Sequence, residues 1–260
     1  MTAYAVGTVL AFAGVGLRRG RPLSLAAAAA AVGLVADLAW WARRVVLGPP
    51  LFADLALDDA LGLAALAAVA AYLWAQGRWR LQALGVLMLP LALMLDLSRV
   101  VWPGPAFAVA PELRDRLLAL HIGVSALGVG ALVLTAAASV LYLVQERALK
   151  GKRPARLFSV LPSLDACDRV LSLSLLVGFA LLTAALVSGA LWSTSAHGRP
   201  RLWQNPAETP ALVAWALLGV LLWTRLIRGW RGRRTAMLAL AGFAALLVRL
   251  LTFSWAGRSA

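Results

Sequence analysis

Long apolar runs without Asp, Glu, Lys or Arg alternate with short polar connections along the whole chain. A membrane-spanning helix needs about 20 predominantly apolar residues, and the shorter runs reach that length by including flanking residues. The pattern therefore predicts about eight spanning helices, built around residues 1–17, 22–36, 60–77, 81–95, 117–145, 170–198, 209–224 and 235–248. The runs at 81–95 and 235–248 are the shortest, and each is also compatible with a helix that enters the membrane without crossing it.

The runs are rich in Ala and Leu and show no period-2 alternation, so they do not predict the strands of a membrane barrel. The connections are short and carry turn residues, such as Gly48-Pro49-Pro50 and Pro103-Gly104-Pro105. No linker is long enough to separate two domains. The sequence therefore predicts an all-α integral membrane protein folded as one bundle.

Composition supports this interpretation, because 62% of the 260 residues are apolar and only 14% are charged. Such a chain has too little polar surface for a water-soluble body. The net charge of +14 is spread between apolar runs and not gathered on one tail or helix, which argues against nucleic acid as a partner. The chain has one cysteine, Cys167, which excludes an intramolecular disulfide and a two-cysteine redox pair.

Basic residues are retained on the cytoplasmic side of a membrane. If the N-terminus is outside, the inner connections carry sixteen of the 25 Lys and Arg residues. The outer segments then carry eight, and Arg249 lies within the last span. This asymmetry predicts that both termini face the outer side.

With that orientation, several ionisable residues converge near the outer helix ends. They are Asp37, Asp96, Arg99, His121, His197, Glu208 and Arg249. Ionisable groups in a bilayer usually face the bundle interior and have partners, so Arg249 is expected to pair with Asp37 or Asp96. We interpret these charges first as links between helices, not as catalytic groups.

The second half of the chain carries an ordered series of motifs: a histidine in LHIG, then LPSL, GFALLT, SGALW, NPAET and GWRGRR. In this order they resemble the cytochrome c assembly protein family, the CcsA-type and HemX-type membrane proteins that handle haem. The resemblance covers about residue 117 to the C-terminus. It implies a cytochrome c assembly protein-like membrane domain at 117–260. The four apolar runs before it predict a four-helix membrane region at 1–116 within the same bundle.

Members of this family carry a tryptophan-rich outer loop that ends in WDPKET and binds haem. The NPAET segment keeps the P-x-E-T positions, including Glu208, and has Asn205 where the family has aspartate. Trp203 matches the preceding tryptophan with one extra residue between them, and Trp215 matches a tryptophan early in the following span. The resemblance implies that Trp192, Trp203 and Trp215 wall a porphyrin.

The family also supplies histidines as axial ligands of haem. His121 matches the family's histidine before the basic loop, so the resemblance implies that it ligates the iron of haem b. His197 stands where the family often has tryptophan, and it either substitutes as a ligand or belongs only to the loop. Trp223 stands where the family often has a histidine, and the family's histidine near the C-terminus has no counterpart.

These observations predict a cytochrome c biogenesis protein of the bacterial cytoplasmic (inner) membrane. It would present haem at the outer face for attachment to apocytochrome c, beside a ResB/Ccs1-type membrane partner and within the lipid bilayer. Arg99, Arg199 or Arg201 would pair with the haem propionates. The sequence has no phosphate-binding glycine loop and no hydrolase motif, so the expected role is positioning and not catalysis.

Two other functions stay open. One is a HemX-like membrane regulator or scaffold without bound haem, which Trp223 favours. The other is a secondary transporter gated by the outer charges, which we rank lowest because the two halves show no internal similarity.

Overall fold

The structure is a computed structural model that describes residues 1–17, 20–47, 57–101, 113–151, 162–197 and 209–256. Within these ranges the chain forms α-helices and one short 3-10 helix, and no strand. The elements are α1 (Thr2–Gly16), α2 (Gly20–Leu47), α3 (Leu57–Trp79), η1 (Gln82–Leu84), α4 (Gly85–Val101), α5 (Leu113–Lys150), α6 (Leu164–His197), α7 (Thr209–Arg228) and α8 (Arg233–Ala256). The all-helical prediction is confirmed.

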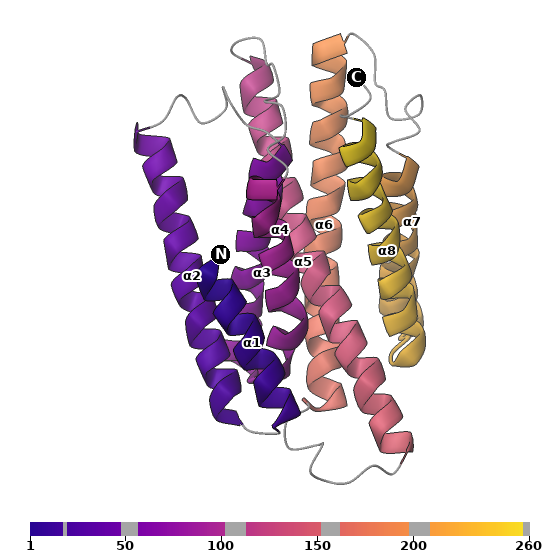
Figure 1. The fold of residues 1–260 in the computed structure, drawn as a ribbon. Helices are drawn as coiled ribbons and strands as arrows, with labels where there is room; N and C mark the ends of the chain where they lie inside the picture. The colour runs from indigo at the N-terminus through magenta and orange to yellow at the C-terminus, as the bar shows by residue number, and fades with distance from the viewer. Residues whose placement is uncertain (18–19, 48–56, 102–112, 152–161, 198–208, 257–260) are drawn as a thin grey trace.

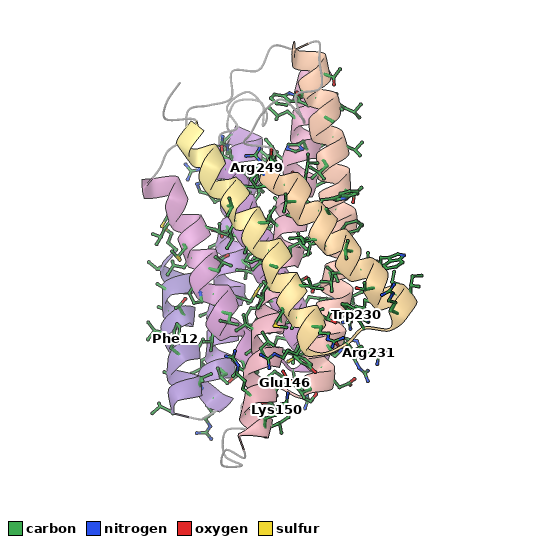
Figure 2. All side chains as sticks on the ribbon, turned by 90° about the vertical axis from the view of Figure 1, so that its right-hand side faces the viewer. Phe12, Glu146, Lys150, Trp230, Arg231 and Arg249 are labelled. Atoms are coloured by element: carbon green, nitrogen blue, oxygen red, sulfur yellow. The ribbon has the colours of Figure 1, made fainter. Side chains whose placement is uncertain are left out.

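Successive helices run in alternate directions, so the bundle has two ends (Figure 1). The upper end, which we call the His121 end, holds the helix termini Leu47, Leu57, Val101, Leu113, His197, Thr209 and Ala256. The lower end, which we call the Arg225 end, holds Gly16, Gly20, Trp79, Gly85, Lys150, Leu164, Arg228 and Arg233. In Figure 2, Arg249 lies toward the His121 end, whereas Glu146 and Lys150 lie at the Arg225 end. The helix ends that flank the four connections expected to be cytoplasmic therefore lie at one end of the bundle.

Five of the described helices are long and apolar enough to cross a membrane, as judged by length and composition. They correspond to Arg21–Leu47, Asp59–Trp79, Leu117–Lys150, Leu164–Thr194 and Thr209–Arg228. Thr2–Gly16 and Gln82–Leu97 are apolar but shorter. Several of the described helices are therefore suited to cross a membrane, as the hydropathy pattern predicts.

Small residues allow the central helices to approach closely. A Cβ added to Gly130 of α5 would lie 2.8 Å from the backbone carbonyl carbon of Ala67 in α3. A Cβ added to Gly178 of α6 would lie 2.7 Å from a methyl group of Leu132 in α5. Close packing of this kind stabilises helices in lipid, where apolar burial supplies no net attraction. One apolar core includes side chains from both Tyr4 and Ala236, near opposite ends of the sequence.

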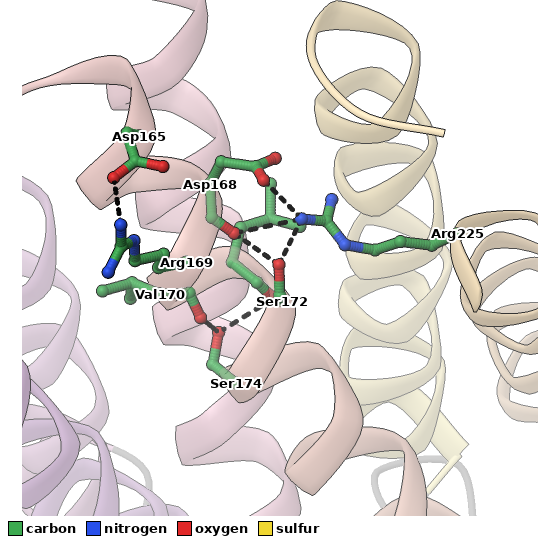
Figure 3. Close-up of polar contacts among 8 residues, drawn as sticks. Asp165, Asp168, Arg169, Val170, Ser172, Ser174 and Arg225 are labelled. Carbon is green, nitrogen blue, oxygen red and sulfur yellow. Dashed lines mark hydrogen bonds and ion pairs between the residues drawn. The ribbon is translucent and has the colours of Figure 1, made fainter. Parts of the chain in front are cut away.

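A buried ion pair joins α6 and α7 at the Arg225 end (Figure 3). Arg225 Nη2 lies 2.6 Å from Asp168 Oδ2 and donates to the Asp168 carbonyl and to Ser172 Oγ. The two charged side chains are only 9% and 16% exposed. Asp168 Oδ1 and Arg225 Nη1 are buried with no hydrogen-bond partner among the described residues. Each charge therefore depends on the other for compensation.

Candidate functional site

The orientation of His121 is set by a contact between α5 and α6. His121 Nδ1 lies 2.8 Å from the backbone carbonyl oxygen of Ala185, and Ser188 Oγ lies 3.4 Å from the same nitrogen. A carbonyl oxygen only accepts hydrogen bonds, so Nδ1 carries the proton and donates it. In this tautomer the lone pair for a metal is on Nε2. Histidines that ligate metals commonly donate their other ring nitrogen to a carbonyl in this way.

The local sequence of α6 makes room for the imidazole ring. A Cβ added to Gly189 would lie 2.8 Å from His121 Cε1 and 3.0 Å from Nδ1. A larger residue at this position would collide with the ring unless the ring or the helix moved. The contact places the half-buried His121 side chain at the α5–α6 interface, toward the end of the bundle that bears its name. A histidine held in this way, with a fixed ring and a defined tautomer, would suit the ligation of a haem iron.

Trp192 lies in the same region as His121. It packs against an apolar cluster formed by Trp41 of α2 and by Leu118 and Ile122 of α5, with residues of α3 around it. Leu118 and Ile122 flank His121 along α5, and Trp192 follows Gly189 by three residues along α6. The structure therefore brings Trp192 and His121 to one part of the bundle.

Trp215 lies on another side of α6. Its indole N–H donates to Thr183 Oγ1 at 3.0 Å, and its ring stacks on Phe179 with centroids 5.9 Å apart. With about 100° between successive helix residues, Phe179 and Thr183 lie about 120° around α6 from Ala185 and Gly189. Trp215 and His121 therefore contact different sides of α6. Trp215 stabilises the α6–α7 contact.

The side chains of the other predicted site residues lie outside the part of the chain that the structure describes. The side chain of His197, the last residue of α6, lies outside the described part, as does that of Arg99. Outside it as well are Arg199, Arg201, Trp203, Asn205 and Glu208. Their roles stay predictions. No cluster of three His, Cys, Asp or Glu residues that is suited to a metal ion occurs among the described residues.

Sequence reasoning missed the ion pair between Arg44 and Asp59. The guanidinium makes two contacts with the carboxylate, of 3.0 and 2.9 Å, and joins α2 to α3. It also lies 5.6 and 5.8 Å from the ring centroids of Trp40 and Trp41. The two tryptophans precede Arg44 by four and three residues. On a helix this spacing predicts the contact between the guanidinium and the rings, and it could be read from the sequence.

The two acidic residues predicted near the outer ends are buried, at 8% exposure for Asp37 and 2% for Asp96. Asp37 accepts a 2.8 Å hydrogen bond from the hydroxyl of Tyr4, and Asp96 Oδ2 lies 3.2 Å from the amino group of Met1. Both carboxylates thus join α1 to a neighbouring helix, as expected for linking charges. Their pairing with Arg249 stays a prediction.

Comparison of this chain with known proteins identifies its relatives. Residues 55–259 match the family described as Cytochrome C assembly protein. The match begins well before residue 117 and so includes α3 and α4. No solved structure matches the chain.

Several relatives are named cytochrome c biogenesis protein CcsA. The protein of Chlamydomonas reinhardtii is 33% identical over 139 residues, which cover 53% of this chain and 38% of the relative. That of Prochlorococcus marinus subsp. pastoris is 31% identical over 168 residues, or 57% and 53% of the two chains. That of Synechococcus sp. (strain CC9311) is 34% identical over 163 residues, or 53% of each. The chain thus matches about half the length of these relatives, or less.

Proposed function

This chain belongs to the cytochrome c assembly protein family, and we propose that it binds haem at the His121 end for delivery to apocytochrome c. The observation that carries the proposal is the hydrogen bond from His121 Nδ1 to the carbonyl of Ala185, which presents Nε2 to iron. The names of the CcsA relatives support a role in cytochrome c biogenesis.

In this proposal the chain's own residues hold and orient haem b, and they make or break no bond. His121 would ligate the iron, and Trp192 with the apolar cluster around Trp41 would exclude water from one side. His197, Trp203, Asn205, Glu208 and Trp215 remain the further contacts that the family motif suggests. Haem supplies the vinyl groups that become attached to apocytochrome cysteines, a step that belongs to a ResB/Ccs1-type partner.

Alanine in place of Gly189 is expected to weaken haem binding about tenfold or more, as loss of an orienting contact does at other metal sites. The added methyl group would lie 2.8 Å from His121 Cε1 and displace the ring from Ala185. The measurement is a haem titration of the detergent-solubilised variant, followed by Soret absorbance.

Gly123→Ala is the matched control. Gly123 lies in α5, two residues after His121, and an added Cβ would meet no atom of the described residues within 4 Å. Both substitutions replace a helical glycine by a better helix former. Equal haem affinity in the two variants would contradict the proposed role of the α5–α6 contact.

We also propose that all eight helices cross the bacterial cytoplasmic membrane, with both termini outside. In intact cells, a cysteine at position 205 should react with a membrane-impermeant maleimide, whereas one at position 231 should not. Asn205→Cys and Arg231→Cys are compared with the unsubstituted chain, whose Cys167 is buried. If position 205 were labelled only after the cells are permeabilised, it would lie on the cytoplasmic side. That result would contradict the proposed orientation and an outer haem site.

The second candidate function is a membrane regulator that does not bind haem. Trp223, at the position where related proteins often have histidine, is 52% exposed, and the Arg228 guanidinium lies 5.2 Å from its ring centroid. A tryptophan side chain does not ligate iron, and position 223 lies toward the Arg225 end of α7, away from His121, so Trp223 would offer haem no second ligand there. A haem-free protein that still supports cytochrome c maturation would favour this candidate.

A further inference from the structure

Four exposed arginines gather where α7 turns into α8. Residues 228–234, which we call the arginine turn, contain Arg228, Arg231, Arg233 and Arg234 and no acidic residue. Figure 2 shows Trp230 and Arg231 at the tip of this turn, at the Arg225 end of the bundle. No carboxylate within the described ranges forms an ion pair with any of the four. The turn is therefore a concentrated, uncompensated positive surface.

The backbone of the arginine turn has a specific conformation. Gly229 and Gly232 have φ angles of +62° and +84°, which other residues rarely adopt. A Cβ on Gly232 would lie 3.1 Å from the hydroxyl of Tyr142, so the turn rests directly on α5. The Trp230 amide donates to the carbonyl of Thr224 at 3.4 Å. The arginines thus project from a supported turn, which reduces the entropy lost when they bind a ligand.

The side chains beside the turn mark the depth of the membrane surface. Leu226 and Ile227, immediately before it, are apolar and 68% and 69% exposed, as expected for residues that face lipid chains. Arg228 lies over the ring of Trp223, and the Arg234 guanidinium lies 5.9 Å from the ring centroid of Trp230. Tryptophan prefers the level of the lipid headgroups. The turn therefore lies where apolar lipid contact gives way to phosphate.

We propose that the arginine turn binds the phosphate of an anionic phospholipid, with the acyl chains along Leu226 and Ile227. Guanidinium groups bind phosphate through two parallel hydrogen bonds, and stacking on tryptophan leaves their N–H donors available. Lys150 and Arg169 at the same end differ, because they are already paired with Glu146 and Asp165. The site is independent of haem.

The test compares two double variants that lose the same charge. Arg228→Gln with Arg234→Gln removes the two stacked guanidiniums, and Lys150→Gln with Arg169→Gln removes two paired cations. Each detergent-solubilised protein is titrated with dioctanoyl phosphatidylglycerol, dioctanoyl phosphatidylcholine and glycerol 3-phosphate. Binding is followed by native mass spectrometry. Each basic residue near an anionic lipid surface adds to the affinity for that lipid, so losing two should lower the affinity for phosphatidylglycerol about tenfold.

The proposal predicts that the unsubstituted protein prefers phosphatidylglycerol over phosphatidylcholine by about tenfold. The arginine-turn variant should lose this preference, and the control variant should keep it. Equal binding of the two lipids by the unsubstituted protein would overturn the proposal and leave the turn to an acidic protein partner. Equal loss in both variants, or binding of glycerol 3-phosphate as tight as that of the lipid, would also overturn it.

Discussion

Asparagine in place of Asp168 is expected to lower the free energy of unfolding by about 3 kcal/mol, because removing one partner of a buried ion pair leaves the other charge uncompensated. The Arg225 guanidinium is 9% exposed and lies 2.6 Å from the Asp168 carboxylate. In the variant the guanidinium faces only neutral acceptors, which are the new amide oxygen, the Ser172 hydroxyl and the backbone carbonyl of residue 168. The measurement is equilibrium unfolding by SDS in mixed micelles, followed by circular dichroism.

Asp165→Asn is the matched control, three residues earlier on α6. Asp165 pairs with Arg169, but the two side chains are 68% and 66% exposed. Solvent screens such a pair, so the control should show no measurable change. A double variant, Asp168→Asn with Arg225→Gln, should lose less stability than the two single variants together. Equal destabilisation by Asp168→Asn and Asp165→Asn would show that the buried pair does not join α6 to α7.

The second large effect is expected at His121. His121→Ala should purify with little haem, or with haem whose Soret band is shifted, because the substitution removes the proposed iron ligand. The comparison is the haem-to-protein ratio and the oxidised and reduced absorption spectra of the two proteins. Both should elute at the same volume in gel filtration, which separates loss of the ligand from loss of the fold.

A second substitution at the same position tests ligation directly. His121→Gly leaves space for a small molecule, so added imidazole should restore the Soret position of the unsubstituted protein. Failure of imidazole to change the spectrum would argue against direct ligation. Unchanged haem content and Soret position in His121→Ala would exclude His121 as the ligand.

The helical organisation was predictable because apolar run length and loop charge follow directly from the membrane. Helix boundaries were less predictable, since charge-free runs underestimate helices whose charges are paired. The run at 22–36 belongs to α2, which continues to Leu47 because Asp37 and Arg44 have partners on α1 and α3. Likewise, Leu117–Lys150 of α5 has 34 residues, about 50 Å of helix, and extends beyond the apolar part of a bilayer.

The candidate site was predictable only in part. Resemblance pointed to His121, but its orientation depends on Ala185 and Gly189, which are distant in sequence and become visible only when α5 and α6 are paired. Similarly, Trp192 and Trp215 have equal weight in the sequence. The structure separates them, since Trp215 bonds to Thr183 on another side of α6.

The central claim is that this chain binds haem, and the absorption spectrum of the unsubstituted protein tests it most directly. The protein is expressed with ample haem, purified in detergent and measured in the oxidised and reduced states. The account predicts a Soret band at a haem-to-protein ratio near one. A protein that purifies and folds without haem, and does not take it up on titration, would contradict the account and favour the membrane regulator.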